Sequence, residues 1–96
     1  MNNKNIISGI DIGTTKIVVI IAEKKDGAIN IIGFGKSNSD GLERGIVVDI
    51  SKTIKSITKA VKQAEEQASI EIESAFVGLT GDHITGMARG IFTFQR

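Results

Sequence analysis

A short segment near the start of the chain combines residue types that can hold a phosphate group. An apolar run delivers Asp11, and the chain then passes through Gly13, Thr14 and Thr15 to Lys16. Glycine lets the backbone approach an anion closely, and the amide N–H groups of Gly13, Thr14 and Thr15 can point into one turn. The threonine hydroxyls can add hydrogen bonds, and the Lys16 ammonium can add a positive charge. These residues predict a phosphate-binding turn between two strands.

Asp11 is the candidate metal-binding residue, because it lies where the first strand meets this turn. A carboxylate there is suited to hold Mg²⁺ through water molecules, since Mg²⁺ keeps much of its hydration shell. The alternative is an ordinary hairpin with a Gly-Thr turn. The apolar runs on both sides of the turn, and Lys16 at the start of the second, favour the phosphate turn.

Most other kinds of chemistry have no support in this sequence. Cysteine is absent, which excludes disulfides, thiolate metal sites and cysteine nucleophiles. The single histidine, His83, offers no basis for a histidine metal site or a Ser-His-Asp triad. The P-loop and dinucleotide-binding patterns are also missing. A net charge of +1 and an aromatic content of 4% argue against a nucleic-acid partner.

The elements that must position the turn are three strands in sequence. Apolar runs at 6–12 and 16–23 flank the turn, and the dipeptide Asp26-Gly27 then predicts a hairpin into a third strand at 28–36. The sequence therefore predicts an antiparallel meander. The first strand is apolar on both faces, which predicts a sheet covered on both sides. Residues 37–45 are interpreted as a polar loop, and 46–48 as a short extended piece.

A long amphipathic helix is predicted after Asp49 or Ser51, either of which can cap it. The helix runs to about Ser69. Its predicted buried stripe repeats at spacings of four and three residues and consists of Ile50, Ile54, Ile57, Val61, Ala64 and Ala68. The lysines that lie off this stripe are predicted to face water; they are Lys52, Lys55, Lys59 and Lys62.

A fourth strand at 74–79 follows the helix, and a strand–helix–strand order predicts a parallel neighbour in the sheet. Residues 84–87 and 90–94 are interpreted as short strand pieces that begin a further, incomplete unit. The predicted fold class is therefore α/β, in one small domain of 96 residues. The longest apolar run, at 17–22, is too short to span a bilayer, and no signal-peptide pattern precedes the first strand. A cytoplasmic location is expected.

The segment Gly-Ile-Asp-Ile-Gly-Thr-Thr-Lys at 9–16 resembles the first phosphate motif of the actin, Hsp70 and sugar-kinase superfamily. Other segments resemble the FtsA family of bacterial cell-division proteins in particular. They are Ile-Ile-Gly-Phe-Gly at 31–35, Gly-Leu-Glu-Arg-Gly-Ile-Val-Val-Asp at 41–49, Ala-Val-Lys-Gln-Ala-Glu at 60–65 and Val-Gly-Leu-Thr-Gly-Asp-His-Ile at 77–84. The similarity covers essentially the whole chain. It implies a ribonuclease-H-like, actin-like subdomain that is incomplete, with ATP and Mg²⁺ as cofactors.

The resemblance also divides the chain. Residues 1–82 would form part of the first actin-like subdomain, and residues 83–96 would begin the small inserted subdomain of FtsA, with His83 at its entry. The chain would then be the N-terminal portion of a longer protein. The second phosphate motif, the adenosine pocket and a C-terminal amphipathic membrane helix would lie outside it. No catalysis is expected from the 96 residues alone.

A protein of this family is implied to bind ATP, to anchor FtsZ filaments to the inner face of the cytoplasmic membrane at the division site, and to self-assemble. The incomplete sheet also leaves unpaired edges, which favours self-association. The alternatives are the N-terminal part of another actin-like ATPase, namely a pilus-assembly ATPase, an Hsp70-type chaperone or a small-molecule kinase.

Overall fold

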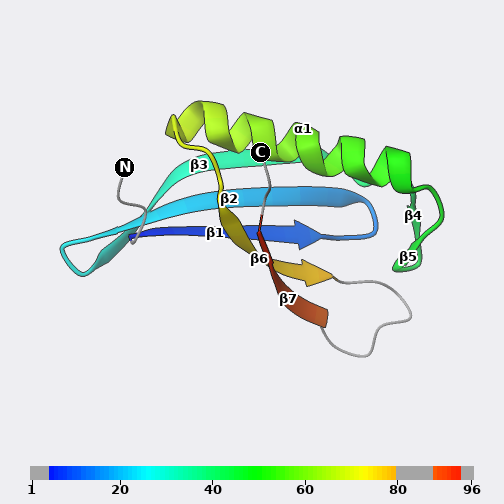
Figure 1. Cartoon of the computed structure of the whole chain (residues 1–96), viewed down its shortest axis with the longest axis horizontal. Helices are drawn as coiled ribbons and strands as arrows, with labels where there is room; N and C mark the ends of the chain where they lie inside the picture. The colour runs from blue at the N-terminus through cyan, green and yellow to red at the C-terminus, as the bar shows by residue number, and fades with distance from the viewer. Residues whose placement is uncertain (1–4, 80–87, 94–96) are drawn as a thin grey trace.

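The computed structural model describes residues 5–79 and 88–93 of the chain. Its main sheet has the strand order β3-β2-β1-β6-β7, and the helix α1 (Ile50–Ala68) lies across one face (Figure 1). The strands of this sheet are β1 (Ile6–Ile12), β2 (Lys16–Lys25), β3 (Ala28–Asn38), β6 (Ser74–Leu79) and β7 (Ala88–Thr93). A small hairpin of β4 (Leu42–Glu43) and β5 (Ile46–Val47) precedes the helix.

The predicted α/β architecture is confirmed. Strands β1, β2 and β3 form an antiparallel meander, and β6 returns parallel to β1 after the helix. The turn between β2 and β3 has positive φ at Asp26 (53°) and Gly27 (78°), as the Asp-Gly signal predicts. The arrangement is that of an incomplete actin-like subdomain.

Four boundaries differ from the sequence-based expectation. Strand β2 continues to Lys25, two residues beyond its predicted end at 23. Strand β3 continues to Asn38, two residues beyond the predicted end. The predicted loop at 37–45 contains β4, which pairs with β5 through a turn with positive φ at Arg44 and Gly45. Strand β7 runs antiparallel to β6 in the same sheet, whereas the strand piece at 84–87 and His83 lie outside the described residues. The division into two subdomains stays a prediction.

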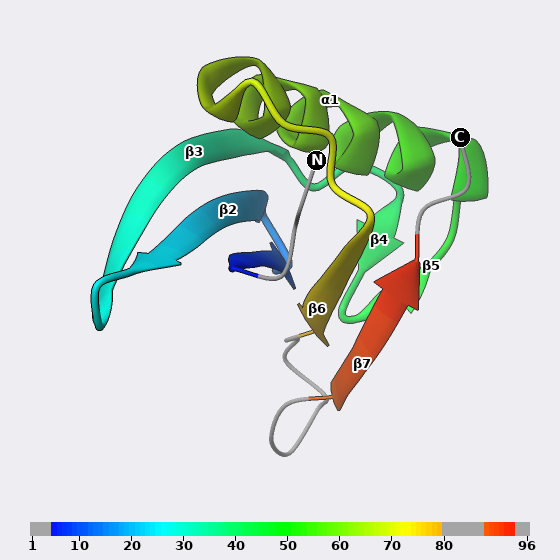
Figure 2. The same cartoon turned by 60° about the vertical axis from the view of Figure 1, so that its left-hand side comes forward.

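The helix packs closely on the edge strand because both surfaces carry small residues. A Cβ atom added at Gly35 would lie 1.8 Å from the carbonyl oxygen of Ala60, and one at Gly33 would lie 2.4 Å from that of Ala64. Only glycine permits this approach of backbone to backbone. The close contact places α1 along β3, at one side of the sheet, while β6 and β7 lie at the other (Figure 2).

The predicted buried stripe of the helix is correct only in its C-terminal half. Val61 and Ala64 are buried and Ile57 packs against the core, but Ile50 and Ile54 are 69% and 56% exposed. In the first half of the helix, the buried positions are polar: Thr53 and Ser56. Their hydroxyls bond the segment that follows β3, since the Thr53 hydroxyl lies 3.2 Å from the Asp40 carbonyl oxygen and the Asp40 N–H donates to Ser56 Oγ (3.2 Å).

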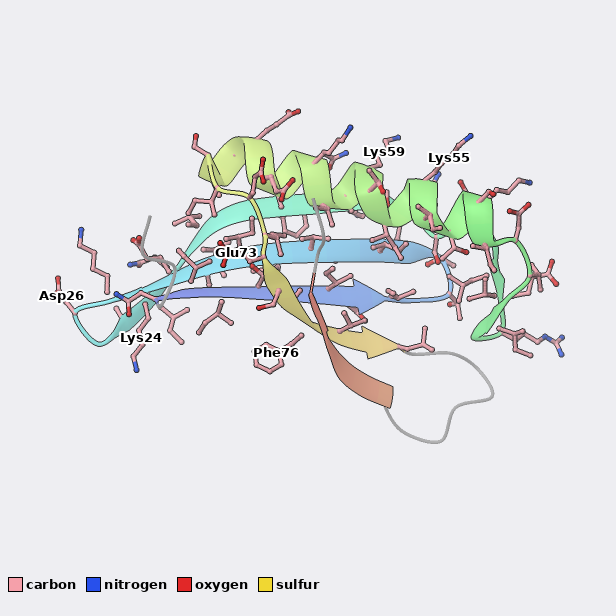
Figure 3. All side chains as sticks on the ribbon, viewed as in Figure 1. Lys24, Asp26, Lys55, Lys59, Glu73 and Phe76 are labelled. Atoms are coloured by element: carbon pink, nitrogen blue, oxygen red, sulfur yellow. The ribbon has the colours of Figure 1, made fainter. Side chains whose placement is uncertain are left out.

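Among the described residues, α1 covers one face of the sheet, so the expectation of cover on both faces is not met there. Strand alternation places Ile7, Ile20, Phe34 and Phe76 on the opposite face, where they are 37–61% exposed. Phe76 projects from β6 away from the helix (Figure 3). Within residues 5–79 and 88–93, no helix has the length and apolar composition needed to cross a membrane.

Candidate functional site

The predicted phosphate turn lies at the tip of the β1–β2 hairpin. Strand β1 ends at Ile12 and β2 begins at Lys16, so Gly13, Thr14 and Thr15 form the connection. The Gly13 N–H donates a hydrogen bond to the Lys16 carbonyl oxygen (3.0 Å), which closes the turn. The hairpin thus holds the two threonines at its tip.

Asp11 and Lys16 lie on the same face of the sheet. The registers pair Ile10 with Val19 and Ile12 with Ile17, and these residues contribute to the core beneath α1. Because side chains alternate along a strand, Asp11 and Lys16 lie on the face opposite the helix. Both residues are exposed. The carboxylate and the ammonium are therefore accessible from the side that α1 leaves uncovered.

The turn is joined to the end of β3 by two hydrogen bonds. Lys16 Nζ donates to Asn38 Oδ1 (2.6 Å), and the Ser39 N–H donates to the Thr15 carbonyl oxygen (2.9 Å). Asn38 therefore holds the Lys16 side chain, and Ser39 holds the backbone of the turn. Neither was among the residues singled out from the sequence. Their polar side chains directly after an apolar strand were the available signal.

Ser39 also leaves a polar atom without a partner. Its side chain is only 9% exposed, and Ser39 Oγ is the one buried side-chain oxygen without a hydrogen bond among the described residues. A buried polar group normally has a partner, because burial without one costs free energy. Ser39 Oγ lies in the residue bonded to Thr15, so it marks spare hydrogen-bonding capacity beside the turn.

The donors at the turn fit a phosphate group, with one change from the expectation. Since the Gly13 N–H closes the turn, the amides left to meet a phosphate are those of Thr14 and Thr15. Their hydroxyls and the Lys16 ammonium complete the set of donors. No group of three or more acidic, histidine or cysteine side chains gathers in the part of the chain described. Asp11 alone fits Mg²⁺ held through water and completed by phosphate oxygens.

A polar depression of about 160 Å³ adjoins this end of the sheet. Asn38 links it to the turn, because this residue bonds Lys16 through its side chain and is also one of the residues that line the depression. The other lining residues come from the end of β3, from the segment after it and from α1: Ser37, Asp40, Lys52, Lys55, Ser56 and Lys59. Lys55 and Lys59 rise from the outer side of the helix, away from the sheet (Figure 3). Lysines thus dominate the charge around this depression.

Comparison with known proteins gives one consistent result. The chain is 58% identical over 71 residues to the cell division protein FtsA of Enterococcus faecalis. It is 43% identical over 84 residues to the cell division protein FtsA of Bacillus subtilis, and 36% identical over 84 residues to that of Escherichia coli K12. These alignments include 74%, 88% and 86% of this chain. No family model matches it.

The alignments extend over only part of each relative. The chain spans 16% of the Enterococcus faecalis protein, 19% of the Bacillus subtilis protein and 20% of the Escherichia coli protein. Most of the sequence of each relative therefore has no counterpart in these 96 residues. Taken with the incomplete actin-like fold, the matches show that the chain is similar to one portion of the FtsA cell division proteins, at 36–58% identity.

Proposed function

We propose that this chain supplies the first phosphate-binding turn of an actin-like, ATP-binding cell division protein. The observation that carries the proposal is the tip of the β1–β2 hairpin, where two threonines and a lysine stand together at one end of the sheet. The relatives named above are all called cell division protein FtsA, which supports a role in division.

Each residue of the turn has a separate part in this proposal. The amides and hydroxyls of Thr14 and Thr15 bind phosphate oxygens, while Gly13 shapes the turn. Lys16 exchanges its bond to Asn38 for a phosphate oxygen, so Asn38 keeps the ammonium in place until the nucleotide arrives. Asp11 holds Mg²⁺ through water. When bound, Mg-ATP brings the metal that offsets part of the phosphate charge.

The proposed cellular role is that of a filament anchor. A protein containing this chain would link FtsZ filaments to the inner face of the cytoplasmic membrane at the division site, and would assemble with copies of itself. The membrane contact would come from a C-terminal amphipathic helix, as the resemblance implies. The turn at Thr14 and Thr15 would make this assembly dependent on nucleotide.

A chimera tests the proposal. This chain replaces the matching residues of the Enterococcus faecalis relative, and ATP binding is measured by isothermal titration calorimetry with and without Mg²⁺. We expect the chimera to bind Mg-ATP and to restore division in cells depleted of their own FtsA. Lys16→Ala should weaken ATP binding at least about tenfold, because a hydrogen bond to a charged group contributes ~1.5–3 kcal/mol.

Lys25→Ala is the matched control. Lys25 is also exposed and lies in β2, but at the end of the strand that is far from the turn. ATP affinity should be unchanged in that variant. Asp11→Asn should reduce the difference between titrations with and without Mg²⁺. Equal ATP affinity in the Lys16→Ala and Lys25→Ala proteins would show that the turn does not bind phosphate.

A further inference from the structure

Strand β3 is an edge strand of 11 residues, the longest strand in the described part of the chain. A long edge presents unpaired backbone N–H and C=O groups, to which the edge of another molecule can bind. In this sheet, alternate residues of β3 direct these groups outward, away from β2. Phe34 and Lys36 are two of these outward-facing residues, because their N–H groups bond to side chains of α1.

Two glutamines of α1 occupy those N–H groups. Gln67 Oε1 accepts from the Phe34 N–H at 2.9 Å, and Gln63 Oε1 accepts from the Lys36 N–H at 3.0 Å. The spacings match, since two strand residues advance by ~6.8 Å and four helix residues by ~6 Å. We call Gln63 and Gln67 the edge glutamines. A helix running antiparallel to β3 can therefore bond consecutive outward amides with residues one turn apart.

The close helix contact is what lets short amides reach the edge. Gly33 and Gly35 bring the backbone of α1 against β3 at Ala60 and Ala64, and Gln63 directly precedes Ala64. A larger residue at either glycine would hold the helix away from the strand. The positions of the edge glutamines thus depend on the same small residues that set the helix packing.

The first part of the β3 edge, before the stretch that the helix covers, contains a β-bulge. The β2–β3 register shifts between Ile21 and Ala22, so β3 carries an extra residue before the stretch covered by the helix. Ile29 and Ile31 lie before this irregularity and are 63% and 60% exposed. A bulge bends and twists an edge, which makes pairing with a regular strand harder. The regular stretch that remains, around Phe34 and Lys36, is the one that the edge glutamines cover.

We propose that the edge glutamines prevent β3 from pairing with the β3 strand of a second copy of this chain. An antiparallel β3–β3 contact is self-complementary about a two-fold axis, so one strand edge suffices to form it. Phe34, 43% exposed on the face opposite α1, would continue its apolar face across such a pair. Removing the two amide oxygens exposes the backbone groups that this pairing requires.

The test uses the full chain with Gln63→Leu and Gln67→Leu combined, which keeps side-chain size but removes both acceptors. Amide hydrogen exchange is followed by NMR, and mass by sedimentation velocity, over a range of concentrations. In dilute solution, exchange at Phe34 and Lys36 should rise about threefold to tenfold, the ratio that loss of one hydrogen bond produces. At high concentration a dimer should form, and exchange at both amides should slow again.

Lys62→Leu with Glu66→Leu is the matched control. These residues are exposed and have the same spacing on α1 as the edge glutamines. Because they carry opposite charges, replacing both leaves the net charge of the chain unchanged. The control therefore matches the glutamine variant in net charge and in the number of leucines added. This control should have the same mass as the unchanged chain at every concentration, with unchanged exchange at Phe34 and Lys36. Gln63→Glu with Gln67→Glu keeps an acceptor at each position and should keep both amides slow.

Several results would overturn the proposal. They are exchange unaffected by the leucine variant, dimerisation of the control to the same extent, or a dimer in which Phe34 and Lys36 still exchange rapidly. Faster exchange without any dimer would also reject it, because the edge would then be open yet unused. If the double variant does not fold, Gln67→Leu alone, at an exposed position, frees the Phe34 amide and permits the same measurements.

Discussion

Two glycines of β3 set the distance between the helix and the sheet. Gly33 and Gly35 lie beneath Ala64 and Ala60, where any side chain would meet helix backbone rather than a flexible side chain. Gly9 in strand β1 differs, since a Cβ atom added there would meet nothing within 4 Å. Contact with the helix backbone therefore requires glycine at Gly33 and Gly35 but not at Gly9.

Gly35→Ala should accordingly destabilise the protein, while Gly9→Ala should not. The added methyl at Gly35 would overlap the Ala60 carbonyl oxygen, and relief requires the helix to move. The expected loss in free energy of unfolding is about 1–3 kcal/mol, the usual cost of overpacking. The Gly9→Ala change should stay within about 0.5 kcal/mol. Urea unfolding followed by circular dichroism measures both; equal losses would mean that the helix is not held against β3 as described.

The turn residues act through bonds to the end of β3. Lys16 and Asn38 are 22 positions apart in the chain, yet their side chains meet at 2.6 Å. This contact fixes the position of the Lys16 ammonium, whereas the sequence shows only that Lys16 lies next to the turn. Because Asn38 accepts from Lys16 while also lining the polar depression, one residue connects the phosphate turn with the lysines of α1.

The helix α1 is an element with two different halves. Its N-terminal half is capped by Asp49, whose Oδ1 accepts from the Lys52 N–H (3.0 Å), and packs through the hydroxyls of Thr53 and Ser56. Its C-terminal half packs through small apolar residues on the glycines of β3. It ends at Ala68 and is capped by Ser69, which adopts the left-handed conformation at φ 55°. Apolar periodicity therefore describes the packing of only one half.

Two isoleucine substitutions in this helix test that division. Ile57→Ala should reduce the free energy of unfolding by about 2 kcal/mol, the low end for a large-to-small core change, because Ile57 is half-buried against the core. Ile54→Ala should cost much less, since Ile54 is 56% exposed and alanine favours a helix. Both are measured by denaturant titration. A larger loss in free energy of unfolding for Ile54→Ala than for Ile57→Ala would mean that Ile54 is buried, as the apolar spacing predicts.

At the scale of the whole molecule, the described chain presents one phosphate turn beside an uncovered apolar face. The turn offers the amides and hydroxyls of Thr14 and Thr15, and the Lys16 ammonium, all at the end of a hairpin. Actin-like sites, as the resemblance implies, clamp phosphates between two such turns. A single turn open to water leaves most of the nucleotide without a contact.

The 96-residue chain by itself should therefore bind Mg-ATP more weakly than ~1 mM, which corresponds to about −4 kcal/mol. Exposed charge pairs contribute only ~0–1 kcal/mol each, whereas association costs at least ~4 kcal/mol. Isothermal titration of the purified chain measures this, with Lys16→Ala as the comparison. A micromolar dissociation constant that Lys16→Ala abolishes would show that the nucleotide site is complete within this chain.

Local patterns in the sequence were sufficient to predict most of the helices and strands. The apolar runs on either side of Gly13, the Asp26-Gly27 turn and the Asp49 cap each act through neighbours in the chain. Such signals depend on backbone geometry and on hydrogen bonds across a few residues, so they can be recognised without knowing the fold. The candidate phosphate turn was found in the same way.

The tertiary structure decided which surfaces meet. Only the placement of β3 beside β2 brings Asn38 to Lys16, and only the contact of Gly33 and Gly35 with α1 brings the edge glutamines to the strand. The same packing exposes Ile54 and buries Thr53, against the apolar spacing of the helix. Spacing gives the average apolar side of a helix, whereas burial depends on the shape and polarity of the partner surface, which distant residues supply.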